Sequence, residues 1–312
     1  MKAIKAGRKT IQVLNSTVNL TVLTIIMLLI AYAGYALWDS NQMYQAADKS
    51  HYAKYKPTAE NQGKTFNELQ ALNPEVIAWL SVYGTNIDYP VTQGLDNIKY
   101  VNTNAEGLYS LSGSIFLDYE NSKIFNDFNS ILYGHHMDKS VMFGEIGEFS
   151  DKKMFESHRY GNLYFDGKDY GIEFFAFIHT SADDSDVFNS GVSEKDRKEY
   201  LDNLLIIAMY TRDISITIED QIVLLSTCSS NSTNGRDILV GRITDELYEN
   251  PFLNKQTNDG KEQSADVLGG LVKEIHLINI ILTALLIVLI TVIIYRRKNR
   301  KVADTYEISN KK

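Results

Sequence analysis

The chain has 312 residues, of which 44% are hydrophobic and 22% charged, a balance typical of folded rather than disordered proteins. Two long apolar blocks flank the segment from Asp39 to Glu274, which carries 20 Lys and Arg against 37 Asp and Glu. The resulting net charge of −17 disfavours nucleic-acid binding through a basic surface.

The first apolar block, residues 18–38, contains no charged residue and is long enough to cross a membrane as a helix. A cleaved signal peptide is the alternative, but this apolar run is longer than is usual for one, so we expect an uncleaved anchor. Lys2, Lys5, Arg8 and Lys9 precede it. By the positive-inside rule, residues 1–17 therefore lie in the cytoplasm.

The second block, residues 275–295, predicts another transmembrane helix. Five basic residues follow it directly, at 296–301, and the same rule also places the tail 296–312 in the cytoplasm. We therefore expect a protein of the cell membrane with two spans, both termini inside and the segment between the spans on the extracellular face.

Between the spans, residues 39–64 are polar and predict an extracellular stalk, and residues 251–274 a linker. The region 65–250 alternates short apolar runs with turn residues, a pattern typical of strands. The strands are expected at 76–80, 87–91, 114–119, 130–133, 162–165, 170–178, 221–227 and 237–243. Helical spacing marks 66–72, 142–149 and 193–210, and Asp166-Gly167 predicts a hairpin. The fold class is therefore mainly β, a closed eight-stranded barrel with inserted helices.

Cys228 is the only cysteine, so the chain forms no internal disulfide, and its scattered histidines give no zinc ligand set at the usual spacing. Cys228 ends one strand, and Arg236 begins the next. If these strands pair, Arg236 returns to the neighbourhood of Cys228, where it could stabilise an oxyanion and a thiolate. A small buried cysteine and an ordinary surface arginine are the alternatives.

The third candidate is a histidine after the strand that ends at Tyr133. Gly134 permits a turn there, and His135 and His136 follow it. A cysteine–histidine pair needs no metal, because the thiolate attacks a carbonyl and the imidazolium protonates the leaving amine. The residues alone leave it open whether the two histidines are simply a surface pair.

These residues resemble the motif of the sortases, a Thr-Leu-x-Thr-Cys strand end with a downstream arginine and an upstream histidine. This chain has Leu224-Leu225-Ser226-Thr227-Cys228, Arg236 and Gly134-His135, with Leu224 where the family has threonine. The segments 73–80, 84–91, 113–118, 133–137 and 142–144 are similar to class B sortases in particular. That class also carries an extra helix where residues 193–210 stand.

The resemblance implies a membrane-anchored cysteine transpeptidase with Cys228 as nucleophile, His135 rather than His136 as acid/base, and Arg236 as oxyanion stabiliser. Its substrates would be surface proteins or pilins with a C-terminal sorting signal, cleaved through a thioacyl-enzyme. Residues 180–193 would help to form the substrate groove. No metal and no organic cofactor is implied.

The acceptor amine is either a pilin lysine or the cross-bridge of a peptidoglycan precursor. The second span is more familiar from pilus-assembling sortases than from most of class B. The segments 37–40 and 44–48 and the paired histidines resemble class B enzymes of streptococcal pilus loci, and together these features favour pilus polymerisation. The Asp-Pro-aromatic lid motif of class C pilus sortases is absent between Asp39 and Asn73. A hydrolytic cysteine protease and a non-enzymatic membrane-tethered binding domain are the remaining alternatives.

Overall fold

The structure is a computed structural model that describes residues 2–58, 63–229 and 233–253. The chain divides into two compact units, Met1–Asn250 and Pro251–Lys312. The expected second span (275–295), the basic tail (296–312) and most of the expected linker (251–274) lie outside the described residues.

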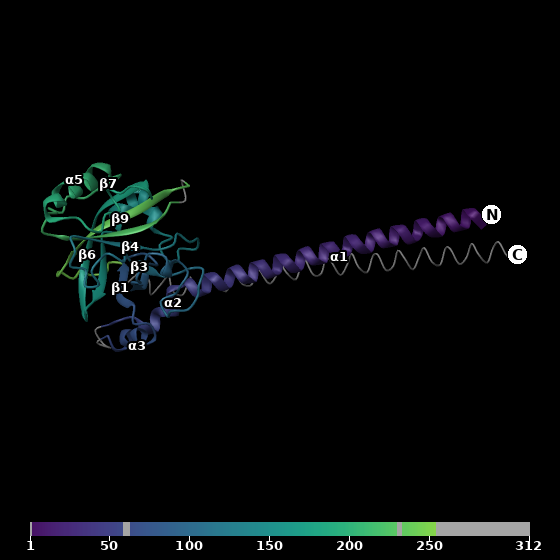
Figure 1. The fold of residues 1–312 in the computed structure, drawn as a ribbon, viewed down its shortest axis with the longest axis horizontal. Helices are drawn as coiled ribbons and strands as arrows, with labels where there is room; N and C mark the ends of the chain where they lie inside the picture. Colours follow the sequence, from purple (N-terminus) through teal and green to yellow (C-terminus); the bar gives the residue numbers. More distant parts are fainter. Residues whose placement is uncertain (1, 59–62, 230–232, 254–312) are drawn as a thin grey trace. The chain divides into compact units, whose positions relative to one another are not determined.

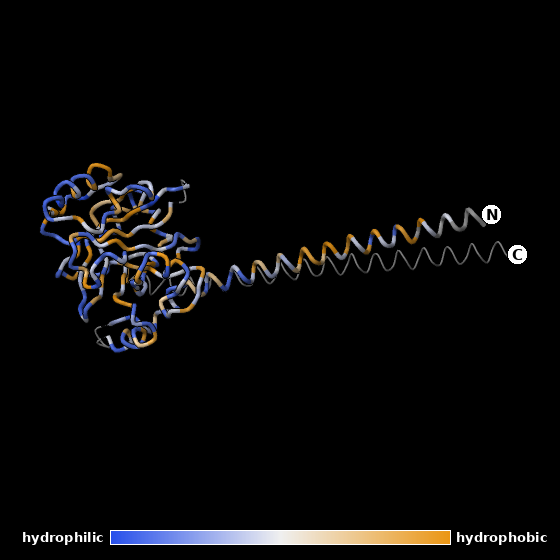
Figure 2. Tube along the Cα trace, viewed as in Figure 1, coloured by the Kyte–Doolittle hydropathy of each residue, from blue (hydrophilic) through white to orange (hydrophobic). Residues whose placement is uncertain are grey.

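A long N-terminal helix, α1 (Lys2–Ala47), contains the first apolar block, which Figure 2 shows in orange. Within Val13–Ala47 the mean hydropathy reaches 2.2, so this helix is long and apolar enough to cross a membrane. The hydroxyls of Thr17, Thr21 and Thr24 each donate to the carbonyl four residues earlier, at 2.9–3.0 Å. These polar groups are thus satisfied inside the helix, as a hydrocarbon environment requires. The helix fits membrane anchoring.

The end of α1 is fixed to the body of the protein. Ala47 is buried, and its carbonyl accepts a hydrogen bond of 3.0 Å from the hydroxyl of Tyr89. Tyr52 and Tyr55, a few residues further on, are buried in the same core cluster. The described part of the expected stalk therefore continues α1 and packs on the barrel. Three short helices complete this region: α2 (Lys49–Tyr52), the 3₁₀ helix η1 (Ala53–Tyr55) and α3 (Lys64–Leu72).

The barrel is closed by eight strands (Figure 1), as the alternating pattern predicts. Hydrogen-bonded neighbours follow the order β5-β1-β2-β3-β4-β8-β9-β6, and pairing of β6 with β5 closes the barrel. The short β7 pairs with β6 outside this closed ring. The strands are β1 (Val76–Val82), β2 (Asp88–Thr92), β3 (Ile115–Leu117), β4 (Asn129–Tyr133), β5 (Tyr160–Phe165), β6 (Lys168–Ser181), β7 (Tyr210–Thr211), β8 (Gln221–Cys228) and β9 (Gly235–Thr244). Most pairs are antiparallel, whereas β2–β3 and β4–β8 are parallel.

Side-chain alternation along β4, β8 and β9 separates two apolar clusters. The inner cluster fills the barrel and includes Leu132, Leu225 and Leu239. Their neighbours in sequence, Ile131, Leu224 and Ile238, face outward into a second cluster with buried residues of helix α5 (Arg197–Ile207). Helix α5 and its neighbours therefore cover the outer face of these three strands. The candidate functional site lies at the ends of the same strands.

Local predictions of turns and helices hold to different degrees. Asp166 and Gly167 have φ of 49° and 73°, the left-handed pair of a type I′ hairpin, and this prediction is confirmed. The helix expected over 193–210 is shorter. A 3₁₀ turn, η4 (Glu194–Asp196), precedes α5, and the chain is extended from Ala208 because Tyr210 joins β6. The remaining short helices are η2 (Lys99–Val101), η3 (Ile146–Ser150) and α4 (Lys152–Ser157).

Candidate active site

Cys228 is the last residue of β8 and is exposed. In the antiparallel β8–β9 pair it lies directly opposite Arg236, and the backbone N–H of Ser229 donates to the Gly235 carbonyl at 2.9 Å. The strand pairing therefore brings Arg236 beside Cys228, as the sequence predicts. Alternation places both residues on the outer face, in line with Leu224 and Ile238.

His135 comes to the same end of the barrel by a different route. Strand β4 runs parallel to β8 with Tyr133 beside Ser226, and the N–H of Gly134 donates to the Ser226 carbonyl at 3.2 Å. His135 and Cys228 each lie two residues beyond that matched pair. The three predicted residues are thus carried by the ends of three neighbouring strands, β4, β8 and β9.

Gly134 is required for this path because there is no room for a side chain. A Cβ atom at this position would lie 2.7 Å from the ring of Phe143, which is fully buried. The chain then turns back, and the N–H of Phe143 donates to the His135 carbonyl at 3.1 Å. Packing on both sides of the turn fixes the backbone of His135.

The imidazole of His135 is half-buried, and its Nε2 atom lies 2.9 Å from the carbonyl oxygen of Val101. A carbonyl only accepts hydrogen bonds, so Nε2 carries the proton in this contact. In the neutral ring, Nδ1 is then the basic nitrogen. Val101 ends the short helix η2, outside the barrel strands.

Tyr133, which sequence reasoning did not select, lies on the outer face between the candidate residues and the β6–α5 segment. Its hydroxyl donates to Asp118 Oδ2 at 3.0 Å, and its ring stacks on Phe188 with centroids 6.3 Å apart. Burial, followed by the nearby Asp118 carboxylate, raises the pKa of Tyr133, while Arg236 opposes this shift. Tyr133 therefore stays protonated and neutral near Arg236.

The β6–α5 segment, which overlaps the expected groove residues 180–193, is held against the barrel. The amide of Asn129 donates to the Asn189 carbonyl at 2.6 Å, and the hydroxyl of Tyr200 donates to the Val187 carbonyl at 2.8 Å. Together with Phe188 on Tyr133, these contacts place the segment beside the exposed end of the outer face.

A buried carboxylate lies on the inner side of the same strand ends. Asp237, next to Arg236 in β9, is 3% exposed and contacts His179 Nδ1 at 2.7 Å. Among the described residues, no three His, Cys, Asp or Glu side chains are grouped as a metal site requires. The arrangement instead offers a thiol, an imidazole and a guanidinium from the ends of three neighbouring strands.

Comparison with known proteins gives a consistent result. No protein-family model matches the chain. Sortase B of Listeria monocytogenes is 30% identical over 237 residues, covering 74% of this chain and 96% of that protein. Sortase B from the type II pilus of Streptococcus pneumoniae has a TM-score of 0.52 at 46% identity, over 58% of this chain and 99% of that structure. A Streptococcus pyogenes class B sortase involved in pilus biogenesis has a TM-score of 0.54 at 42% identity, over 58% and 99%.

The fold and these relatives define the class of protein as a membrane-anchored cysteine transpeptidase that acts on surface proteins bearing a sorting signal. The chain belongs to the sortase B family.

Proposed function

We propose that Cys228, His135 and Arg236 are the catalytic residues of this transpeptidase. The observation that carries the proposal is the strand register. Cys228 lies opposite Arg236, and His135 follows the end of the strand that runs parallel to that of Cys228. No other cysteine exists in the chain to supply the thiol.

The first half of the reaction follows from these groups. The Cys228 thiolate attacks the scissile carbonyl carbon, and the Arg236 guanidinium donates to the oxygen on which negative charge develops. As the C–N bond breaks, protonated His135 gives a proton to the leaving amine. This leaves a thioester between Cys228 and the new C-terminus of the substrate.

In the second half an acceptor amine takes the place of the leaving amine. Neutral His135 removes a proton from the amine as its nitrogen attacks the thioester, and the Cys228 thiolate leaves. Because Val101 accepts from Nε2 in the resting structure, we assign both proton transfers to Nδ1 of His135. The net result is one amide broken and one formed.

For the acceptor we propose a pilin lysine. Support comes from the two streptococcal relatives, one from a pilus and one involved in pilus biogenesis, at 46% and 42% identity. The cross-bridge of a peptidoglycan precursor is the alternative acceptor, and water would make the same centre a hydrolase.

Product analysis by mass spectrometry tests the proposal. The full chain in nanodiscs, beside a Cys228→Ala variant, is incubated with sorting-signal peptides and either a pilin domain or a cross-bridge peptide. We expect ligation to the pilin lysine, which the variant lacks. Ligation to the cross-bridge peptide alone would assign wall anchoring, and equal behaviour of enzyme and variant would refute the role of Cys228.

We further propose the two-span topology, with the barrel (65–250) outside and both termini in the cytoplasm. The charge pattern around the two apolar blocks supports it. Protease treatment of intact cells tests it: epitopes at both termini should survive, whereas an epitope within the linker 251–274 should be lost. Survival of the linker epitope would contradict this orientation.

A further inference from the structure

Helix α1 passes from its apolar stretch into the barrel core without a break. Buried Ala47 comes only nine residues after Trp38, the last residue of that stretch. At 1.5 Å per residue these nine residues span about 14 Å. If α1 crosses the membrane, part of the barrel surface must lie close to the lipid headgroups.

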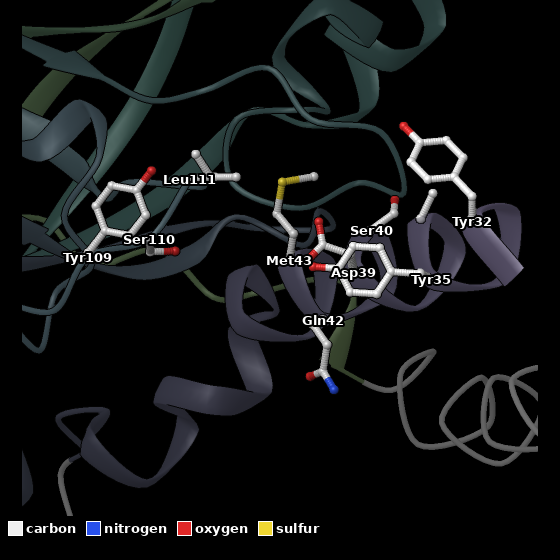
Figure 3. A pocket seen from close by; sticks show the side chains of 10 residues that line it. Tyr32, Tyr35, Asp39, Ser40, Gln42, Met43, Tyr109, Ser110 and Leu111 are labelled. Carbon is white, nitrogen blue, oxygen red and sulfur yellow. The ribbon is translucent and has the colours of Figure 1, made fainter. Parts of the chain in front are cut away.

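The loop Leu108–Leu111, between η2 and β3, lies beside this part of α1. Tyr109, Ser110 and Leu111 share an open cavity of about 520 Å³ with side chains of the helix (Figure 3). Those helix residues are Tyr32, Tyr35, Ala36, Asp39, Ser40, Gln42 and Met43. The loop therefore reaches the level at which the apolar stretch of α1 ends.

Large apolar side chains at this level are exposed. Leu108, Tyr109 and Leu111 are 62%, 78% and 56% exposed. Single exposed apolar residues are ordinary, but three within four residues beside a membrane helix form a local apolar surface. Tyr35 and Trp38 of α1, also exposed, are of the aromatic type that gathers at membrane interfaces.

The negative charge of the segment between the apolar blocks indicates that any membrane contact here is made by apolar side chains. The segment between the two apolar blocks has a net charge of −17, so anionic lipids do not attract it as a whole. Burial of leucine and tyrosine side chains at the headgroup boundary does not require a basic patch.

We propose that the loop Leu108–Leu111 inserts into the interface of the membrane that α1 crosses, with lipid as its partner. This goes beyond the catalytic proposal and rests on the membrane-spanning role of α1. The barrel then has a further attachment to the bilayer, on a loop rather than on a helix.

The loop is also connected to the candidate histidine. The N–H of Ser114 donates to the Tyr100 carbonyl at 3.0 Å, and the Ser114 hydroxyl donates to the Thr103 carbonyl at 2.8 Å. These bonds join the two ends of the segment that contains the loop next to Val101, whose carbonyl accepts from His135. Lipid contact at the loop thus acts on a segment that positions the imidazole.

Lipid quenching of a fluorophore tests the insertion. In the full chain with Cys228→Ala, which removes the only native thiol, Tyr109→Cys is labelled with an environment-sensitive dye and reconstituted in phosphatidylcholine nanodiscs. Ile206→Cys, on α5 and 81% exposed, is the aqueous control. Leu28→Cys, in the middle of the apolar block, is the membrane control.

We expect the Tyr109 label to shift its emission to shorter wavelength and to be quenched most by lipids with a nitroxide near the headgroup. The Ile206 label should do neither, and the Leu28 label should be quenched most by nitroxides deep in the acyl chain. Emission from position 109 like that from position 206 would overturn the proposal. A shift without quenching would also overturn it, because protein such as the second apolar block would then cover the loop. Neither result bears on Cys228 chemistry.

Discussion

The Nε2 atom of His135 lies 2.9 Å from the carbonyl oxygen of Val101, so a backbone atom outside the barrel strands sets the orientation of the candidate acid/base. A second residue fixes that carbonyl. Gly113 has φ of +57°, and a Cβ there would lie 2.5 Å from the Val101 oxygen. We expect Gly113→Ala to displace Val101 and to lower kcat more than it changes KM.

Gly167→Ala is the matched control for this substitution. Gly167 also has a positive φ, +73°, but no atom lies within 4 Å of its added Cβ. Both variants should lose roughly 1–2 kcal/mol of unfolding free energy through the left-handed backbone, and Gly113→Ala should lose more because its Cβ meets the Tyr100 and Val101 carbonyls. Steady-state ligation kinetics separate them, since kcat should fall in Gly113→Ala alone. An equal kcat in the two variants would show that Val101 does not position His135.

Arg236 should matter through its shape as well as its charge. Arg236→Lys keeps the positive charge but loses the planar array of donors, and Arg236→Ala loses both. We expect a fall in kcat on the order of 10²-fold or more for Arg236→Ala, as for other oxyanion donors, with Arg236→Lys only partly restored. Arg242→Lys, on the same strand and bound to Glu173 at 2.7 Å, should leave kcat about unchanged. If Arg236→Lys retained full kcat, Arg236 would act as a charge alone.

The Tyr133 hydroxyl should contribute to stability. Tyr133→Phe removes its bond to Asp118 Oδ2, and that oxygen still accepts from Asn97 at 2.8 Å. The loss should therefore be about 1 kcal/mol, because no buried acceptor is left unpaired. Tyr119→Phe is the control, since it removes a similar bond of 3.1 Å to Glu120 at an exposed site. Urea unfolding of both variants should show a loss in Tyr133→Phe alone; equal stabilities would contradict this account.

Glu145 should make the unfolding free energy depend on pH, and the direction of its pKa shift fixes the sign of that dependence. Desolvation raises its pKa above the usual 4.5, despite a hydrogen bond from the N–H of Asn86. The folded state therefore holds this proton to higher pH than the unfolded chain does. The contribution of Glu145 is fully present below pH 4.5 and declines as pH rises through the higher folded pKa.

The Glu145→Gln variant isolates that contribution. Its unfolding free energy minus that of the wild type should increase from pH 4 to pH 7, because the glutamine cannot ionise. Parallel stability curves for Glu145→Gln and the wild type would rule out the raised pKa.

The closed barrel and the pairing of Cys228 with Arg236 could be predicted from the sequence because both depend on local patterns. The alternation of apolar and polar residues that marks a strand is visible among neighbouring residues. The loop that joins β8 to β9 is short, so these two strands are expected to pair. The parallel pairing of β4 with β8 could not be predicted, since the two strands are far apart along the chain. The structure aligns His135 with Cys228 through that pairing.

Other parts of the site do not depend on a particular residue type, so the sequence carries no signal for them. Any residue at position 101 supplies a carbonyl, so the acceptor for His135 has no sequence signal. The stacking of Phe188 on Tyr133 depends on how a long segment folds back. Helical spacing continues through Tyr210, yet the helix ends at Ile207 because pairing with β6 takes over.

The positions of β8 and β9 in the chain also determine when the candidate thiol centre can form during synthesis and folding. Both strands are central in the barrel and late in the sequence, so the nucleophile is synthesised long after the strand that carries His135. Pairings so distant in sequence form slowly, because the intervening chain must be ordered first. A chain synthesised only as far as β4 therefore carries no thiol centre. The centre is assembled only after β8 has been made and has paired with β4 and with β9.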